Sequence, residues 1–234
     1  VVFAAATDDS RPVLTGVYTE MKGKDLTLAA ADGFRLAVYK AALPSAVPDE
    51  VAVIIPARTL AEVNRLLSGE EKEVTLAINP AKSQILFRFK DVELVSQLIQ
   101  GTFPNYSQLI PQSYDTRAVM DVAEFSRATK AASIFARDGS GIVRIQVTAA
   151  EGGGKASISA RAEEVGDDLG EIDAEVEGED AKIAFNSKYL TDVLAILDKG
   201  KVALETTSPS SPGVIKPVGA DNYLHVIMPM FVQW

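Results

Sequence analysis

Few side chains in this sequence have types and spacings that suggest chemistry. The single histidine, His225, lies in an alternating apolar stretch, and the chain has no cysteine and no Gly-x-Ser-x-Gly serine to accompany it. An unrecognised hydrolase would need a nucleophile beside a base, and no such pair is found. We therefore expect His225 to be structural and the protein to have no catalytic residues.

A glycine-rich segment at residues 152–155 has some likeness to a phosphate-binding loop. However, the residue five before Gly154 is Ala149, and Ala156 follows Lys155 where that motif has serine or threonine. A glycine hairpin turn between two strands explains the segment more simply.

The densest charge lies between residues 163 and 180, which contain ten carboxylates and no basic residue. The run lacks the spaced ligands, the central glycine and the closing glutamate of a calcium-binding loop, so we expect a solvated sheet edge and no metal site. Its members are Glu163, Glu164, Asp167, Asp168, Glu171, Asp173, Glu175, Glu177, Glu179 and Asp180.

Length and composition indicate a folded protein. The chain has 234 residues, of which 47% are apolar and 24% charged, with a formal net charge of −9. This is ordinary globular usage and excludes collagen-like and disordered classes. The longest apolar runs are far shorter than the roughly 20 residues that cross a bilayer. The net charge argues against general nucleic-acid affinity, although a basic face on selected helices is compatible with it.

A weak internal repeat determines where the elements lie. Pro56, Asp121 and Asn186 each follow a strand-like segment and precede an amphipathic helix, and they are 65 positions apart. Proline at a first helical turn and Asp or Asn caps are typical helix starts. One unit is therefore a strand, a helix and three further strands.

The predicted fold class is α+β, with two domains of helices on antiparallel sheets. Glycine and proline in residues 101–114 indicate a crossing between domains at 1–105 and 106–234. Helices are expected at 57–67 and after positions 121 and 186. Strands are expected at 13–20, 26–31, 34–40, 51–56, 74–78, 84–89, 92–99, 118–120, 143–148, 156–162, 171–176, 182–185, 202–206, 213–218 and 223–228.

The repeat also predicts a helix that starts about nine residues before Val1, with residues 3–6 as its last turn. The sequence also lacks an initiator methionine. We therefore expect it to begin inside a helix of a longer protein.

Three segments are unusual for plain core sequence: residues 31–38 (ADGFRLAV), 103–111 (FPNYSQLIP) and 225–230 (HVIMPM). Each alone fits a hairpin, a linker or a terminal strand. Together and in this order, beside residues 185–189 (FNSKY), they resemble the bacterial DNA polymerase III β sliding clamp. The resemblance runs over the whole chain and corresponds to the second and third of the three domains in that family, so 1–105 would be an N-terminally truncated middle domain and 106–234 the C-terminal domain.

The resemblance implies a processivity factor of DNA replication, without catalytic activity or cofactor. The intact protein would be a head-to-tail homodimeric ring in the cytoplasm, associated with the nucleoid, with helices lining the inner face and sheets forming the outer face. The implied partners are double-stranded DNA, held without sequence preference, and the DNA polymerase III catalytic subunit, the clamp loader, translesion polymerases and mismatch-repair proteins. The alternative is a clamp-like peptide-binding module that does not encircle DNA.

The resemblance also assigns residues. The implied peptide-binding pocket consists of Leu14, Gly33, Phe34, Arg35, Leu36, Pro104, Gln108, Leu109, Asn186, Tyr189, Pro209, Ser211, Val226, Ile227, Met228, Pro229 and Met230. The DNA-facing candidates are Arg58, Arg65, Arg127, Lys130 and Lys188. The candidates for the dimer interface are Ile134, Phe135, Glu163, Glu164, Asp167 and Asp168.

Some positions depart from the usual pattern of the family. Phe34 and Gln108 replace a histidine and a basic residue, Pro209 stiffens one pocket wall, and residues 231–234 extend beyond the usual short tail. A short peptide in such a pocket is expected to bind at about micromolar strength, roughly −8 kcal/mol. Phe231 and Trp234 could fold over the pocket or fill that of a neighbour.

Overall fold

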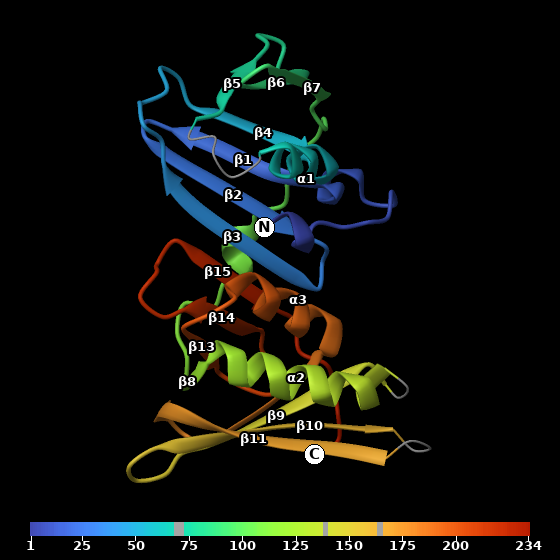
Figure 1. Cartoon of the computed structure of the whole chain (residues 1–234), viewed down its shortest axis with the longest axis vertical. Helices are drawn as coiled ribbons and strands as arrows, with labels where there is room; N and C mark the ends of the chain where they lie inside the picture. Colours follow the sequence, from blue (N-terminus) through green and yellow to red (C-terminus); the bar gives the residue numbers. More distant parts are fainter. Residues whose placement is uncertain (68–72, 138–139, 163–165) are drawn as a thin grey trace. The chain divides into compact units, whose positions relative to one another are not determined.

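The structure is a computed structural model and describes residues 1–67, 73–137, 140–162 and 166–234 (Figure 1). These residues form two compact units, Val1–Tyr106 and Ser107–Trp234. We call them unit 1 and unit 2 and describe each by itself.

Unit 1 contains a four-stranded antiparallel sheet in the order β3-β2-β1-β4 and a three-stranded sheet in the order β5-β6-β7. The strands of the first sheet are β1 (Gly16–Lys22), β2 (Asp25–Ala31), β3 (Arg35–Ala42) and β4 (Val51–Pro56). Helix α1 (Ala57–Leu66) follows β4, and β5 (Thr75–Ile78), β6 (Gln84–Phe89) and β7 (Val92–Gln97) form the second sheet. Two 3-10 turns, η1 (Val2–Ala4) and η2 (Pro12–Thr15), precede β1, and a third, η3 (Tyr106–Leu109), begins at the last residue of the unit.

The core of unit 1 lies between α1 and the strands. Val63 of the helix is buried with Ile55 of β4 and with Ile85 and Phe87 of β6, and Leu60 packs against them. Because residues 60 and 63 are one helical turn apart, they share the face that is turned to this core.

Unit 2 contains antiparallel strands in the order β12-β9-β10-β11-β8-β13-β14-β15. Its elements are β8 (Thr116–Asp121), α2 (Val122–Arg137), β9 (Ile142–Thr148), β10 (Gly154–Ala162), β11 (Gly166–Gly178), β12 (Ala181–Asn186), α3 (Ser187–Leu197), β13 (Lys201–Thr206), β14 (Gly213–Pro217) and β15 (Tyr223–Ile227). Helix α2 packs on β9, β10 and β11 and against α3, through a buried face that includes Phe125, Ala128 and Ala132.

The predicted α+β class and the strand-to-helix repeat are confirmed. Each of α1, α2 and α3 directly follows a strand, and the strand ends at Pro56, Asp121 and Asn186. The side chain of Asp121 accepts hydrogen bonds from the backbone N–H groups of Ala123 and Glu124, at 2.9 and 3.1 Å, as expected for a residue that starts a helix.

Two predicted strands have a boundary that differs from the structure by more than two residues. The first strand starts at Gly16 instead of residue 13, because residues 12–15 form a 3-10 turn with proline at its start. Strand β11 spans Gly166–Gly178 instead of 171–176, because residues 166–174 pair in register with β10. Alternation with acidic residues hid the length of this strand.

Helix length gives no indication of a membrane span. Among the residues that the structure describes, no helix is long and apolar enough to cross a bilayer.

Candidate functional site

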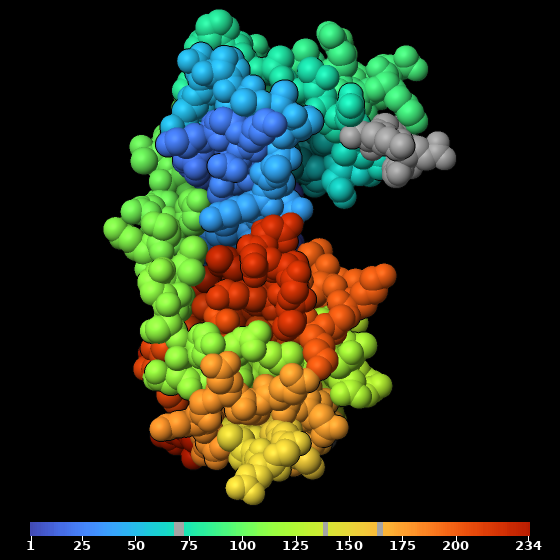
Figure 2. All heavy atoms as spheres, turned by 90° about the vertical axis from the view of Figure 1, so that its left-hand side faces the viewer, coloured from blue at the N-terminus to red at the C-terminus, as the bar shows by residue number. Residues whose placement is uncertain are grey.

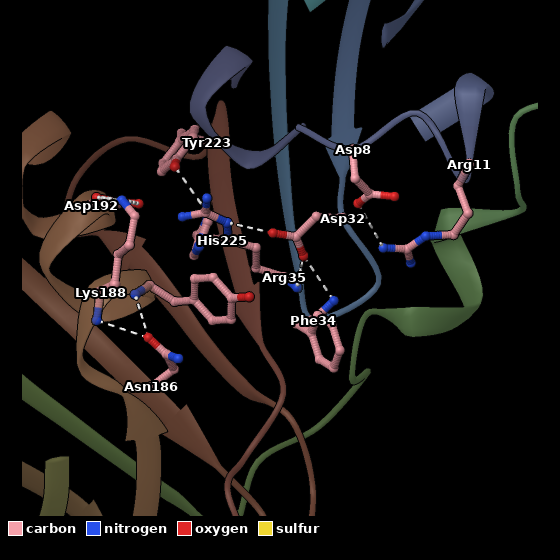
Figure 3. Close-up of polar contacts among 11 residues, drawn as sticks. Asp8, Arg11, Asp32, Phe34, Arg35, Asn186, Lys188, Asp192, Tyr223 and His225 are labelled. Carbon is pink, nitrogen blue, oxygen red and sulfur yellow. Dashed lines mark hydrogen bonds and ion pairs between the residues drawn. The ribbon is translucent and has the colours of Figure 1, made fainter. Parts of the chain in front are cut away.

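The turn between β2 and β3 in unit 1 is organised by Asp32. Its Oδ1 atom accepts hydrogen bonds from the backbone N–H groups of Phe34 and Arg35, at 2.8 and 3.0 Å, and its Oδ2 atom accepts one from Nε of Arg35 at 3.0 Å (Figure 3). Gly33 has a φ of +93°, which is a conformation that favours glycine in such a turn. Asp32 is not among the predicted site residues, although an Asp-Gly pair between two strands is a local turn signal.

This turn presents Phe34 and holds Arg35. The Phe34 side chain is 56% exposed, whereas Arg35 is 8% exposed and its guanidinium lies 5.6 Å from the centroid of the Phe3 ring. Two further residues assigned to the pocket, Leu14 and Leu36, are buried. Within unit 1, Leu14 and Leu36 are therefore interior residues, whereas Phe34 is at the surface.

An aromatic cluster fixes the end of unit 1, where Pro104 lies. The ring centroids of Phe103 and Tyr106 are 5.6 and 5.9 Å from that of Tyr18, which is on β1. The Tyr18 hydroxyl donates a hydrogen bond of 2.9 Å to Oε1 of Glu20. Burial, and then this bond to the carboxylate, raise the pKa of Tyr18 to about 12. Burial also raises the pKa of Tyr106.

In unit 2, Asn186 ends β12 and caps α3. Its Oδ1 atom accepts hydrogen bonds from the backbone N–H groups of Lys188 at 2.9 Å and Tyr189 at 3.4 Å (Figure 3). The side-chain carbonyl of Asn186, which the resemblance assigns to the pocket, is thus engaged at the helix start. Tyr189 is partly buried in the first turn of the same helix.

The residues after β15 are attached to β12. Val226 and Ile227 are buried in β15, and the chain then leaves the strand at Met228, which is 42% exposed. Two residues later, the backbone N–H of Met230 donates a hydrogen bond of 2.8 Å to the carbonyl oxygen of Ala184. We call residues 228–230 the methionine wall.

The unit 2 members assigned to the pocket lie in one neighbourhood. Gly213 at the start of β14 pairs with Ile227, and the ring of Phe185 on β12 lies directly against Gly213. Ser211 precedes Gly213 in a loop where the Oγ atoms of Ser208 and Ser211 are 2.8 Å apart. Pro209 lies in this loop and is exposed. The loop, the methionine wall and the start of α3 therefore adjoin one another.

The remaining pocket candidates belong to the segment between the strands of the two units. Gln108 and Leu109 are exposed residues of the 3-10 turn Tyr106–Leu109. Leu14, Gly33, Phe34, Arg35, Leu36 and Pro104 belong to unit 1, and Gln108, Leu109, Asn186, Tyr189, Pro209, Ser211, Val226, Ile227, Met228, Pro229 and Met230 belong to unit 2.

Three of the five cations assigned to DNA have an acidic partner on their own helix. Arg65 donates two hydrogen bonds to Glu62, at 2.8 and 2.6 Å, and this interaction lowers the pKa of Glu62 and raises that of Arg65. Arg127 lies 3.9 Å from Glu124, and Lys188 lies 3.0 Å from Asp192. Arg58 on α1 and Lys130 on α2 are exposed and make no ion pair with any residue that the structure describes.

The candidates for the dimer interface lie on α2 and at the start of β11. Ile134 is 54% exposed, and the Phe135 ring lies beside Gly166. Asp167 and Asp168 are the second and third residues of β11. Glu163 and Glu164 lie outside the described residues. Residues 166–174 of β11 pair with β10 on one side, and residues 175–178 pair with β8 on the other side. In the described part of unit 2, no strand therefore pairs with the second side of residues 166–174. Leu169, 65% exposed, was not predicted as part of this surface.

The glycine-rich segment is a hairpin turn. Gly152 and Gly153 are exposed between β9 and β10, with φ values of +87° and +139°, in the region coloured yellow in Figure 2. No group of three or more His, Cys, Asp or Glu residues suited to hold a metal occurs in the described parts of the chain.

Family models match both units in order. A model for the central domain of the DNA polymerase III beta subunit matches residues 1–105, and a model for the C-terminal domain of the same subunit matches residues 107–231.

Curated relatives match nearly the full sequence. The beta sliding clamp of Staphylococcus aureus is 35% identical over 229 residues, which is 97% of this chain and 59% of the relative. The beta sliding clamp of Staphylococcus epidermidis is 32% identical over the same share. The chain thus spans about three fifths of the length of these relatives.

Solved structures share the fold. The DNA polymerase sliding clamp of Bacillus subtilis has a TM-score of 0.92 at 31% identity and covers 99% of this chain and 60% of that one. The DNA polymerase III subunit beta of Pseudomonas aeruginosa has a TM-score of 0.90 at 27% identity, over 99% of this chain and 62% of that one.

Proposed function

Because this chain belongs to the family of the DNA polymerase III beta subunit, we propose that it supplies the middle and C-terminal domains of a bacterial sliding clamp. The observation that carries the proposal is the pair of consecutive matches, to the central domain and then to the C-terminal domain of that subunit. The function is non-catalytic. The intact protein encircles duplex DNA and tethers replication and repair proteins to it, in the cytoplasm at the nucleoid.

The proposed tether is a short peptide motif of each partner, which binds at the pocket residues named above. The partners are the polymerase catalytic subunit, the clamp loader, translesion polymerases and mismatch-repair proteins. The exposed side chain of Met228 and the adjoining Pro229 and Met230 supply an adaptable apolar surface. A flexible thioether wall suits several partners, because it can repack around different apolar anchors.

Contact with DNA is proposed for the helices. Cations on α1 and α2 would approach phosphates without reading bases, and such contacts allow a ring to slide. Arg58 and Lys130 are the most available, since Arg65, Arg127 and Lys188 already have acidic partners on their helices.

Ring closure in the intact homodimer is proposed at β11. The edge of residues 166–174 offers backbone groups for pairing with another chain, and the exposed Leu169 and Ile134 offer apolar surface beside it. We expect the chain as given not to close such a ring, and native mass spectrometry with circular DNA checks this.

The proposed peptide-binding pocket is tested by measuring the affinity for a peptide. Fluorescence anisotropy of a labelled Gln-x-x-Leu-Phe peptide is expected to show saturation at about micromolar concentration. Met228→Ala should weaken binding about tenfold, because truncation of a central anchor typically costs 1 kcal/mol or more. Val218→Ala is the matched control, since Val218 is 44% exposed and lies on the same unit outside the methionine wall.

Equal affinities for the wild type, Met228→Ala and Val218→Ala would contradict the pocket. The alternative function, a peptide-binding module that does not encircle DNA, shares every pocket residue. Retention of the intact parent on circular but not on linear DNA separates the two.

A further inference from the structure

The segment after the methionine wall, Phe231 to Trp234, lies against the edge strand of unit 2. It follows Met230, whose N–H is bonded to the carbonyl of Ala184 on β12. Four residues further on, the Trp234 ring lies 5.8 Å from Nζ of Lys182, which is on the same strand. β12 is the outermost strand of this sheet, with β9 as its neighbour. We call residues 231–234 the aromatic segment.

The contacts of Met230 with Ala184 and of Trp234 with Lys182 define the direction in which the aromatic segment runs. Along β12, Lys182 and Asn186 lie on opposite sides of Ala184. The aromatic segment therefore runs from Ala184 toward Lys182 and away from the start of α3 and from Asn186. In unit 2 it therefore lies along β12, on the side of Ala184 that is farther from Asn186.

From this geometry we propose that the aromatic segment is a strap that holds the methionine wall in place, with Lys182 and Trp234 as its positioning residues. The inference rests on the proposed function, because the wall is the surface that would bind partner peptides. Met228 and Pro229 are fixed on one side by β15 and on the other by the Met230–Ala184 hydrogen bond. A single backbone hydrogen bond at a sheet edge can open locally, and a second anchor beyond it makes opening less frequent.

The chemistry of the second anchor fits this role. Tryptophan has the aromatic face that attracts a cation most strongly, and the lysine stem reaches it from the strand. Trp234 keeps 45% of its surface exposed and Phe231 keeps 85%, so burial of apolar surface alone does not explain the position of the segment. The model of the C-terminal domain matches residues 107–231, so Trp234 lies outside the matched range.

Tryptophan fluorescence reports on the aromatic segment alone, because Trp234 is the only tryptophan of the chain. Lys182→Met keeps most of the side-chain stem but removes the charge. We expect it to shift the Trp234 emission to longer wavelength and Lys182→Arg to retain the wild-type emission. Ile196→Ala, an exposed position on α3, should leave the emission unchanged.

The readout that decides the proposal is amide hydrogen exchange at Met230. A cation–π contact at an exposed site is worth about 0.5–1 kcal/mol, which corresponds to a two- to fivefold change in an equilibrium. Trp234→Ala and Lys182→Met should therefore each speed exchange at the Met230 amide about two- to fivefold, and the double variant should do no more than either one. Trp234→Phe should have a smaller effect. Unchanged exchange at Met230 in Trp234→Ala would overturn the strap.

Peptide titrations separate this inference from the proposed function. If the strap holds the binding wall, Trp234→Ala should weaken the peptide about two- to fivefold, and Lys182→Arg should restore what Lys182→Met loses. If the wild type fails to bind the peptide, the proposed function has failed, while the exchange rate at Met230 still decides whether the strap exists. Binding that is intact in Trp234→Ala despite faster exchange would refute its role in positioning the wall.

Discussion

The ring of Phe185 fills the space beside the Cα atom of Gly213. A Cβ added at Gly213 would overlap Cζ of that ring and lie 3.0 Å from Cε1. Since Gly213 also pairs with Ile227 on β15, this close approach brings together β12, β14 and β15 at the place where the methionine wall begins.

Gly213→Ala is therefore expected to destabilise unit 2 by about 1–3 kcal/mol, because the Phe185 ring is fully buried and cannot move aside without strain. Urea unfolding followed by circular dichroism measures this loss. Gly170→Ala is the matched control: its Cβ would lie 3.3 Å from that of Ala128, which is tight but not an overlap. A Gly213→Ala loss no larger than that of the control would refute the packing argument.

Asp32→Ala should lower the stability of unit 1 by about 1.5–3 kcal/mol, because hydrogen bonds to a charged group contribute that much. The substitution removes two bonds to the backbone of the turn and the ion pair with Arg35, whose side chain is 7% exposed. Asp8→Ala is the comparison. Asp8 also faces an arginine, at 3.7 Å, but both side chains are exposed, so its loss should cost clearly less than that of Asp32.

Asp32→Ala is also expected to weaken peptide binding, since the same turn orients Phe34 and Arg35. A loss of affinity in Asp8→Ala as large as that in Asp32→Ala would contradict the role of this turn.

The pH dependence of stability should reveal Tyr18. Its folded-state pKa of about 12 is above the ordinary value of 10, because burial and the Glu20 carboxylate disfavour the phenolate. The stability that the neutral phenol contributes is therefore fully present below pH 10 and is lost as the pH rises toward 12. Unfolding free energies of Tyr18→Phe should fall less steeply than those of the wild type across this interval.

Tyrosinate absorbance gives an independent measurement of the same group. The wild type should contain one tyrosine that ionises near pH 12, and Tyr18→Phe should lack it. An identical pH profile in the two proteins would show that another group governs the alkaline transition.

Sequence periodicity predicted most of the fold because each helix directly follows a strand, and Pro56, Asp121 and Asn186 mark those starts locally. Strand β11 was predicted too short, since its acidic residues obscured an alternation that pairing with β10 makes evident. The candidate site was only partly predictable. Resemblance identified Met228 and Met230, but the Met230–Ala184 and Trp234–Lys182 contacts join residues far apart in the sequence, and no local pattern reports them.

For the cations on the helices, in contrast, a local pattern is informative. The spacing of acidic and basic residues along a helix indicates which cations are paired, and a count of basic residues does not. Glu62 and Arg65 are three positions apart on α1, which places them side by side. Two of the five N–H donors of Arg65 are already used by Glu62, and the carboxylate offsets the charge that would attract a phosphate. The proposed DNA-facing surface is therefore weaker than its number of basic residues suggests.

Glu62→Gln should accordingly strengthen the binding of this chain to duplex DNA. One added phosphate contact steepens the dependence of log affinity on log salt concentration by about 0.9, and fluorescence anisotropy with a labelled duplex measures this slope. Glu93→Gln is the control, because Glu93 forms a similar pair, 2.6 Å from Arg88, but on strands of the β6–β7 sheet instead of on a helix. Both substitutions change the net charge equally. If they strengthen DNA binding equally, the gain comes from net charge alone and α1 is not a DNA-facing surface; a steeper slope for Glu62→Gln alone assigns the contact to Arg65.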